Sequence, residues 1–279
     1  MKMPQRIRAR RHYRSRGYEV FRGAFAANQI DAIANLARTV AGSSAKLRRQ
    51  DGTFAVNDFF PGTTLVRNPL LHAHLSLPAD LEQLSTDLRA LVTCDALAER
   101  LQALDGQRHY VVHQSLLFFA AQTTDIHLDS WSLDTAPRGH SHTVWIPLQD
   151  MDHRTGLPCV IPWRSGDVVT EHQLGLMPGG ADPRAERYEL YHRALRQKLL
   201  ADHPEVVTAL VGRGDFMIWS SLTPHFTLPA HPFPTERLSL QVLIRPADKR
   251  WGDFLDQPYN RTSVQLERIN NRFSIKLAA

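Results

Sequence analysis

A histidine and an aspartate stand two residues apart in the chain, at His127 and Asp129. On a β-strand, residues i and i+2 point to the same face, so these two side chains can bind one cation together. Histidine is also the commonest metal ligand among side chains. A second His-x-acid pair, His203 and Glu205, follows a predicted helix and has proline between its members, so we set it aside. The first pair is therefore the candidate metal site.

A site with two histidines and one carboxylate needs its third ligand from a distant strand. Two histidines, His225 and His231, stand between a predicted strand at 215–219 and the next predicted strand, which opens at Arg237. Both are candidates for the third ligand on position alone.

Arg237 and Ser239 share one face of that next strand, because they are two residues apart. A guanidinium group binds a carboxylate through two parallel hydrogen bonds, and a neighbouring hydroxyl adds a third. A metal held by two histidines and one aspartate, beside a receptor for a carboxylate, is what an Fe(II)- and 2-oxoglutarate-dependent oxygenase requires.

The predicted elements that position these residues change from mainly helices to mainly strands near residue 108. Apolar residues at helical spacing predict helices early in the chain, whereas short apolar runs bounded by glycine and proline predict strands later. The predicted helices are 27–41, 81–91, 95–104 and 182–202, and the predicted strands are 18–21, 110–112, 116–120, 143–148, 157–161, 215–219 and 237–244. Many short strands with one helical insertion indicate a sandwich or barrel in a single domain.

Composition excludes several other classes. Hydrophobic residues make up 43% and charged residues 22% of the 279 positions, which are ordinary globular values. No apolar run reaches the roughly 18 residues of a membrane helix, and no apolar stretch follows the basic N-terminus as in a secretory signal. Two cysteines, Cys94 and Cys159, are too few for a disulfide framework or a zinc cluster. We expect a cytoplasmic protein with no membrane partner.

The net charge of +5 is concentrated at the N-terminus. Residues 1–17 contain seven lysines and arginines and no acid, so the remainder carries a net charge of −2. We predict a solvated basic tail over 1–17 and a single domain over 18–279. Contact between the tail and nucleic acid or acidic lipid is the alternative, but no basic patch interleaved with aromatic residues continues into the body, so we expect no nucleic-acid partner.

Four ordered motifs together resemble the phytanoyl-CoA dioxygenase-like family of Fe(II)/2-oxoglutarate-dependent oxygenases. The segment 17–23 resembles the opening of that family, and 127–131 resembles its first metal motif. The segment 143–150, followed by Gly156 and 160–162, resembles its central strands. The last block consists of Gly214, Asp215, His225, Thr227 and Arg237. The resemblance runs from about residue 13 to 245.

This resemblance implies a mainly β fold with flanking helices (α+β), whose core is a double-stranded β-helix, that is, a cupin-like jelly roll. It implies Fe(II), 2-oxoglutarate and O₂ as cofactor and co-substrates. The implied metal ligands, which are also the catalytic residues, are His127, Asp129 and His225. The family spacing of ten to fourteen residues to the arginine favours His225 over His231.

The resemblance also implies the residues that bind 2-oxoglutarate. Arg237 would hold its C5-carboxylate, with Thr227 and Ser239 as hydroxyl contacts. Two departures concern this part of the site. Where the family has the turn sequence Pro-Gly-Ser-His, this chain has Pro162-Trp163-Arg164-Ser165. A basic residue that some members use for the co-substrate has no lysine counterpart, and Gln114 is the predicted substitute.

The implied reaction is hydroxylation of an unactivated C–H bond, with succinate and CO₂ as co-products. Related halogenases have a small residue where this chain has Asp129, which argues against halogenation. The segment 166–213 carries Arg184, Arg187, Arg193 and Arg196 and is a predicted lid, so we expect a small, anionic metabolite as substrate. The alternative is a jelly-roll metalloprotein without oxygenase activity, such as a cupin-type isomerase or a sensor, which would need no co-substrate arginine.

Other residues near the motifs have plainer interpretations. His140, His142 and His153 suggest a second metal centre by their number, but loop histidines are the simpler prediction. Trp131 follows the metal motif by two residues, so we predict that it lines the substrate pocket, whereas Trp145 can equally fill the core. The oligomeric state stays open.

Overall fold

The structure is a computed structural model that describes residues 3–131, 133–165, 167–176, 184–202, 204–208, 210–252 and 274–277. No helix in this part of the chain has the length and apolar character needed to cross a membrane. The predicted pair at 203–205 falls partly outside the described residues, because His203 is not among them.

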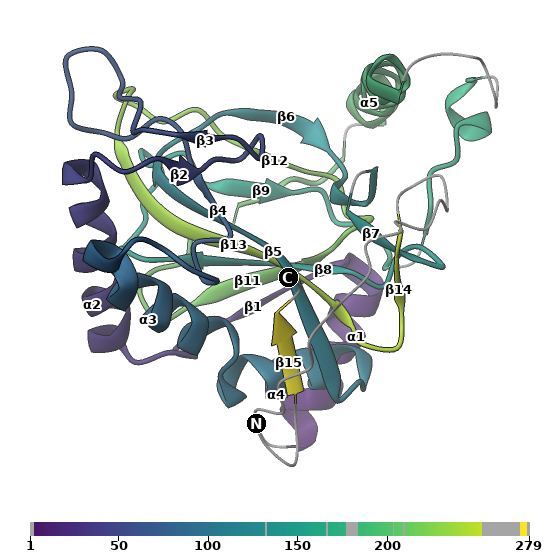
Figure 1. Cartoon of the computed structure of the whole chain (residues 1–279). Helices are drawn as coiled ribbons and strands as arrows, with labels where there is room; N and C mark the ends of the chain where they lie inside the picture. Colours follow the sequence, from purple (N-terminus) through teal and green to yellow (C-terminus); the bar gives the residue numbers. More distant parts are fainter. Residues whose placement is uncertain are drawn as a thin grey trace.

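Four of the described α-helices and four short strands lie before residue 106, and the longer strands follow, with one further helix, α5, among them (Figure 1). The helices are α1 (Met3–Arg16), α2 (Ala27–Thr39), α3 (Glu82–Val92), α4 (Asp95–Asp105) and α5 (Arg184–Ala201), with short 3₁₀ turns η1 (Val40–Gly42), η2 (Ala79–Leu81), η3 (Asp129–Trp131) and η4 (His172–Leu174). The strands are β1 (Tyr18–Phe21), β2 (Leu47–Arg48), β3 (Phe54–Ala55), β4 (Leu70–Leu71), β5 (His109–Ala120), β6 (Thr124–His127), β7 (Asp134–Ala136), β8 (His142–Pro147), β9 (Pro158–Val160), β10 (Val207–Thr208), β11 (Phe216–Ser220), β12 (His225–Thr227), β13 (Glu236–Pro246), β14 (Arg250–Gly252) and β15 (Ser274–Leu277).

Two main sheets face each other (Figure 1). The larger sheet has the strand order β1-β11-β8-β13-β5-β15, with β4 also paired to β5. The smaller sheet has the order β10-β9-β12-β6. All pairs between β1, β11, β8, β13 and β5 are antiparallel. Neighbours in each sheet are distant in sequence, so the chain crosses repeatedly between the two layers.

The central strand β13 shows how the sequence separates a core face from a site face. Leu238, Leu240, Val242 and Ile244 belong to the main hydrophobic core. That core also contains the apolar faces of α2, α3 and α4, which cover the outer side of the larger sheet (Figure 1). Because side chains alternate along a strand, Arg237 and the other odd-numbered residues of β13 point into the space between the two sheets. The alternating pattern in 237–244 therefore positions the functional side chains.

Most predicted elements are confirmed within a few residues of their predicted ends. The two strands predicted at 110–112 and 116–120 are instead one long strand, β5. In the sequence, the polar run His113-Gln114-Ser115 suggests a break between two strands. In the structure this run continues the strand, and its side chains face a cavity or the interior.

The basic N-terminal segment differs from the solvated tail that we expected. Residues 3–16 form α1, in which Ala9 and Tyr13 are buried. The helix packs against α4, and the Tyr13 hydroxyl lies 2.7 Å from His142 Nδ1. Arginine is a good helix former, and two buried residues four positions apart form one face. In the sequence this narrow apolar face is hard to recognise, because Ala9 and Tyr13 stand among many arginines.

Helix α5 lies within the predicted lid and packs against β6. Its Arg187 forms an ion pair with Glu171, at 2.5 Å between Nη2 and Oε2, and its Arg196 lies 3.3 Å from an Asp125 carboxylate oxygen. Both arginines therefore have acidic partners within the protein. The side chain of Arg184 and residues 177–183 of the predicted lid lie outside the described part of the structure. The lid remains a prediction.

Candidate functional site

The structure brings His127, Asp129 and His225 together. His127 ends β6 and His225 begins β12, and the two residues are direct partners in the antiparallel pairing of these strands. Asp129 opens the turn η3, two residues after His127. One ligand atom from each side chain lies within 4.8 Å of the other two. Among the described residues this is the one group of three such side chains close enough to share a metal ion.

Both histidines are held in the orientation that a metal site needs. His127 Nδ1 lies 2.7 Å from the Asp125 carbonyl oxygen, and His225 Nδ1 lies 2.9 Å from the Thr223 carbonyl oxygen. A carbonyl oxygen only accepts hydrogen bonds, so each Nδ1 carries the proton and donates it. Nε2 of each neutral ring is then the free lone pair, as in metal sites whose histidines are oriented by a carbonyl group.

Two donors that the sequence analysis missed hold the Asp129 carboxylate. The Thr143 hydroxyl donates to Asp129 Oδ2 at 2.5 Å, and the Trp219 indole N–H donates to the same oxygen at 3.0 Å. Thr143 is the second residue of β8, and Trp219 lies near the end of β11. Alternation with the core residues Val144 and Ile218 predicts which face of its strand each residue occupies, but it does not predict that this face lies opposite Asp129.

The pKa values of the three side chains are shifted by burial and by one another. Burial, followed by the charge of His225, lowers the pKa of His127 to about 4. Burial opposes ionisation of Asp129, but the attraction of the two histidines outweighs it and holds the pKa of that carboxyl well below its usual range. Burial likewise opposes protonation of His225, yet the Asp129 carboxylate raises the pKa of His225 above its ordinary value. At neutral pH the group therefore offers an anionic carboxylate beside at least one neutral imidazole.

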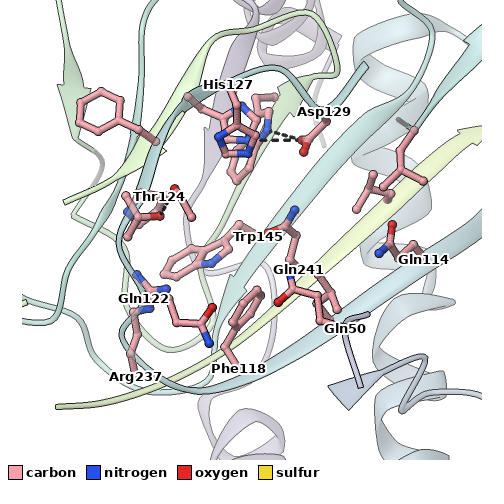
Figure 2. A pocket seen from close by; sticks show the side chains of 18 residues that line it. Gln50, Gln114, Phe118, Gln122, Thr124, His127, Asp129, Trp145, Arg237 and Gln241 are labelled. Atoms are coloured by element: carbon pink, nitrogen blue, oxygen red, sulfur yellow. Dashed lines mark hydrogen bonds and ion pairs between the residues drawn. The ribbon is translucent and has the colours of Figure 1, made fainter. Parts of the chain in front are cut away.

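A cavity of about 200 Å³ lies between the two sheets beside this group. It is lined by Gln50, Gln114, Leu116, Phe118, Gln122, Thr124, His127, Asp129, Leu133, Trp145, Pro158, Trp219, His225, Phe226, Thr227, Arg237, Gln241 and Leu243. Figure 2 shows His127 and Asp129 at one end of this metal-site cavity, with Arg237 and Gln114 on opposite sides of it. The larger sheet supplies Arg237, and the smaller sheet supplies Thr227.

Arg237 is a buried cation inside the metal-site cavity. Its side chain is 4% exposed, and burial lowers its pKa to about 10, so it stays protonated at neutral pH. One guanidinium nitrogen donates to the Gly156 carbonyl oxygen, while Nε has no hydrogen-bond partner within the described structure. A buried cation costs free energy unless it is paired. The unpartnered side of the Arg237 guanidinium can therefore pair with an anion in the cavity.

The other predicted co-substrate residues surround Arg237 in different ways. Thr227 lines the cavity and its hydroxyl lies 3.2 Å from that of Thr124. Ser239 falls between Arg237 and Gln241 on the inner face of β13 but is not among the cavity-lining residues; its buried hydroxyl has no hydrogen-bond partner in the described part of the chain. Gln114 lines the cavity, and its buried Oε1 likewise has no partner there.

Three irregularities in strand pairing adjoin the site. Glu236 pairs with Ala120 and Ser239 with Phe118, so β13 has an extra residue where Arg237 lies. A second irregularity lies on β6, which has an extra residue between His127 and Thr124, the partners of His225 and Thr227. A third irregularity lies on β5, which has an extra residue between Gln114 and Val112, the partners of Leu243 and Ile244. Bulges of this kind re-aim side chains and are common next to active sites.

Several other residues that the sequence analysis considered do not line the metal-site cavity. Trp131 is not among the residues lining the metal-site cavity; its ring packs 5.1 Å from that of Tyr191 in a separate hydrophobic cluster, whereas Trp145 does line the cavity. His142 bonds to Tyr13 and lies 2.9 Å from Asp105, so it belongs to a structural network. The backbone N–H of His231 donates to the Arg154 carbonyl oxygen.

The residues present fit a divalent iron ion and a dicarboxylate. Two imidazoles, once both are neutral, and one carboxylate form the donor set of non-haem iron oxygenases, in which further coordination positions stay open. Arg237, whose Nε has no partner among the described residues, lines the cavity and can donate to a carboxylate there, whereas the unpartnered hydroxyl of Ser239 lies beside it and outside the lining. The fit concerns donor chemistry and burial, and it agrees with the ligands expected from the sequence.

Known proteins resemble this chain in both sequence and fold. The sequence matches the phytanoyl-CoA dioxygenase (PhyH) family over residues 13–231. No curated protein sequence matches the chain. Among solved structures, the epimerase SnoN in complex with Fe³⁺, alpha-ketoglutarate and nogalamycin RO is 19% identical with a TM-score of 0.64, and the match covers 100% of this chain and 97% of that one.

Two further solved structures are similar over most of their length. The carbocyclase SnoK from nogalamycin biosynthesis is 18% identical with a TM-score of 0.62, covering 92% of this chain and 93% of that one. EctD from S. alaskensis, with 2-oxoglutarate and 5-hydroxyectoine, is 18% identical with a TM-score of 0.59, covering 90% of this chain and 78% of that one. These similarities confirm the predicted jelly-roll fold.

Proposed function

This chain belongs to the phytanoyl-CoA dioxygenase family, and from that premise we propose that it hydroxylates an unactivated C–H bond of a small, anionic metabolite. Family membership makes it an iron- and 2-oxoglutarate-dependent oxygenase. The type of oxidation and the class of substrate are the proposed part. The observation that supports 2-oxoglutarate chemistry at this site is a buried arginine, Arg237, in the same cavity as His127, Asp129 and His225, and hydroxylation is the outcome we propose for that chemistry.

In this proposal His127, Asp129 and His225 hold Fe(II) through Nε2, a carboxylate oxygen and Nε2. The hydrogen bonds from the two Nδ1 atoms to carbonyl oxygens fix both rings. Thr143 and Trp219 occupy Asp129 Oδ2, so they restrict the carboxylate to one orientation. Iron and 2-oxoglutarate, when bound, supply the O₂ activation that breaks the C–H bond.

Arg237 is proposed to hold the far carboxylate of 2-oxoglutarate, with Thr227 and Ser239 as hydroxyl contacts and Gln114 as a further polar contact. The Gly156 carbonyl oxygen occupies one edge of the Arg237 guanidinium and thereby fixes its plane. The apolar walls Leu116, Phe118 and Trp145 exclude water from this end of the cavity. A jelly-roll metalloprotein without oxygenase activity would have no use for this buried cation.

Each turnover of the proposed reaction consumes one O₂. One oxygen atom enters the carboxylate of succinate, CO₂ leaves from 2-oxoglutarate, and the second oxygen atom enters the substrate C–H bond as a hydroxyl. The SnoN and SnoK structures carry the names of an epimerase and a carbocyclase. Stereochemical inversion and ring closure are therefore the outcomes against which hydroxylation has to be tested.

The test is turnover of a metabolite extract by purified enzyme with Fe(II), 2-oxoglutarate and ¹⁸O₂, followed by mass spectrometry. Hydroxylation predicts succinate formation together with a product that contains one labelled oxygen atom. Succinate formed with a product that has lost hydrogen or changed configuration, without labelled oxygen, would replace hydroxylation by one of the other outcomes. The Arg237→Gln variant serves as the matched control, because it should need far more 2-oxoglutarate for the same rate.

A further inference from the structure

A second cavity of about 320 Å³ opens beside the metal-site cavity. The two cavities share Gln50, Gln114 and Leu133 as lining residues, so they adjoin at these three side chains. In Figure 2, Gln50 and Gln114 lie on the side of the metal-site cavity away from Arg237. A molecule in the second cavity would therefore approach the metal ligands from the side opposite the proposed 2-oxoglutarate site.

His113 is the most informative residue in the second cavity. Its side chain is 1% exposed, yet neither ring nitrogen has a hydrogen-bond partner in the described part of the structure. Its ring packs edge-on against Trp251, with centroids 4.6 Å apart. Buried polar groups are nearly always hydrogen-bonded, so an orphaned imidazole that lines a cavity marks a place for a ligand atom.

A β-bulge brings His113 to this position. In β5, Gln114 pairs with Leu243 and Val112 with Ile244, so His113 is the extra residue of the strand. In a regular strand His113 and Gln114 would point to opposite faces, but both line the second cavity. The bulge therefore turns a residue of the core face toward the cavity.

The lining of the second cavity contains one cation and one acid, and they differ in whether their polar atoms already have partners. Arg48, at the end of β2, lines it, and its buried Nε has no hydrogen-bond partner within the described residues. The acid in the lining, Asp51, is held by its own turn, where the N–H and hydroxyl of Thr53 donate to Oδ1 at 2.9 Å and 2.7 Å. Burial, followed by the charge of Arg245, lowers the pKa of His113 to about 3, so its neutral ring can donate one hydrogen bond.

A strained residue, His72, completes the polar side of the second cavity. Its φ of 58° lies in the left-handed region, which residues other than glycine rarely adopt. Two backbone hydrogen bonds hold it there: its N–H donates to the Ser115 carbonyl oxygen at 2.8 Å, and its carbonyl oxygen accepts from Leu75 at 2.9 Å. Non-glycine residues in such conformations cluster at ligand sites.

We infer that the second cavity binds the anionic group of the oxidised substrate, a carboxylate or a phosphate, with Arg48 as counter-ion and His113 as hydrogen-bond donor. The inference rests on the proposed function and adds a substrate class to it. The substrate is an organic acid or phosphate ester whose apolar portion passes Leu133 and the two glutamines. That portion presents a C–H bond at the metal ligands while the anionic end stays in the second cavity.

The experiment uses full-length protein saturated with redox-inert Mn(II) and 2-oxoglutarate. The probes are hexanoate, hexyl phosphate and neutral 1-hexanol, titrated by calorimetry. We expect at least one anionic probe to bind about tenfold to a hundredfold more tightly than 1-hexanol, because a hydrogen bond to a charged partner is involved. The tighter of the two anions identifies the group that the cavity recognises. Equal affinities for all three probes would overturn the inference.

Substitutions locate the binding. Arg48→Gln should remove the preference for the anion, Arg48→Lys should keep part of it, and His113→Gln should weaken it. The matched control is Arg108→Gln, which removes an exposed arginine immediately before β5 and should change nothing. An unchanged preference in Arg48→Gln would overturn the inference. Affinity for 2-oxoglutarate should be the same in all these variants, since Arg237 is intact.

Paramagnetic relaxation by Mn(II) gives a readout that needs no variant. The methyl end of the bound anionic probe should relax faster than the methylene beside its anionic group, because the anion is held away from the metal ligands. The opposite gradient would place the anion at the metal and overturn the inference. Failure of the proposed hydroxylation is distinguishable, because it would appear in the ¹⁸O₂ experiment as succinate formed without a labelled product, whatever the three probes show here.

Discussion

His127 and His225 are direct cross-strand partners, and their ring centroids lie 4.3 Å apart. Two residues almost a hundred positions apart in sequence are thus fixed by the register of β6 and β12. Asp129 Oδ2 lies 3.5 Å from His225 Nε2. The candidate metal ligands are therefore already assembled by backbone pairing, and residues that support this arrangement should control metal affinity without touching the metal.

Thr143 should be one of these supporting residues. Thr143→Val keeps the shape of the side chain but removes the hydroxyl that donates to Asp129 Oδ2. Loss of such an outer hydrogen bond lowers metal affinity about tenfold to a hundredfold. Calorimetric titration with Mn(II) measures the change. Thr93→Val is the control, because its hydroxyl donates to the Arg89 carbonyl oxygen away from the site. Equal affinity in wild type and Thr143→Val would remove Thr143 from this role.

Gly17 should couple the end of α1 to the site. It has a φ of +74°, and an added Cβ would lie 2.3 Å from both Thr223 Oγ1 and the Trp163 carbonyl oxygen. The Thr223 carbonyl oxygen accepts the hydrogen bond from His225 Nδ1. Gly17→Ala should therefore lower both thermal stability and Mn(II) affinity, since Thr223 must move.

Gly23→Ala is the matched control for Gly17→Ala. Its φ of +55° is also in the left-handed region, but an added Cβ meets no atom within 4 Å. It should carry only the conformational cost, about 1 kcal/mol, with no change in Mn(II) affinity. If the two alanine variants lose stability and affinity equally, steric coupling through Thr223 is wrong.

Tyr13 should make α1 a structural part of the domain. Tyr13→Phe removes the hydroxyl bonded to His142 Nδ1 and leaves that nitrogen buried without this partner. The expected loss is about 1–3 kcal/mol of unfolding free energy, measured by urea denaturation. Arg8→Gln removes a charge from the exposed side of the same helix and should change stability by less than about 0.5 kcal/mol. A solvated tail would predict no loss for either variant.

Metal affinity should fall as the pH falls. The Asp129 carboxylate raises the pKa of His225 above its ordinary value of about 6.5. Below that raised pKa, His225 is protonated and must release a proton before its Nε2 can bind a metal. Calorimetry of Mn(II) binding in two buffers with different ionisation enthalpies should show proton release at pH 6.5. Affinity that is constant between pH 6 and 8 would contradict this protonation state.

Sequence patterns predicted the site where local spacing was sufficient. His127 and Asp129 stand two residues apart, and Arg237 and Ser239 share a strand face, so no tertiary information was needed to select them. The strand predicted to carry both metal ligands ends at His127, and Asp129 lies in the turn η3 that follows. Thr143 and Trp219 were missed because their role depends on which strand lies opposite Asp129. His113 was missed because only a bulge, invisible in the sequence, turns it toward a cavity. The apolar face of α1 was hidden because Ala9 and Tyr13 stand among arginines.

The central claim is that His127, Asp129 and His225 hold one metal ion on which 2-oxoglutarate depends. The most direct test is calorimetric titration of the apoprotein with Mn(II), followed by 2-oxoglutarate, for wild type and for Asp129→Ala. We predict one Mn(II) per wild-type chain, 2-oxoglutarate binding only after metal is added, and loss of both in Asp129→Ala while circular dichroism shows a retained fold. Stoichiometric Mn(II) binding by folded Asp129→Ala would contradict the assignment.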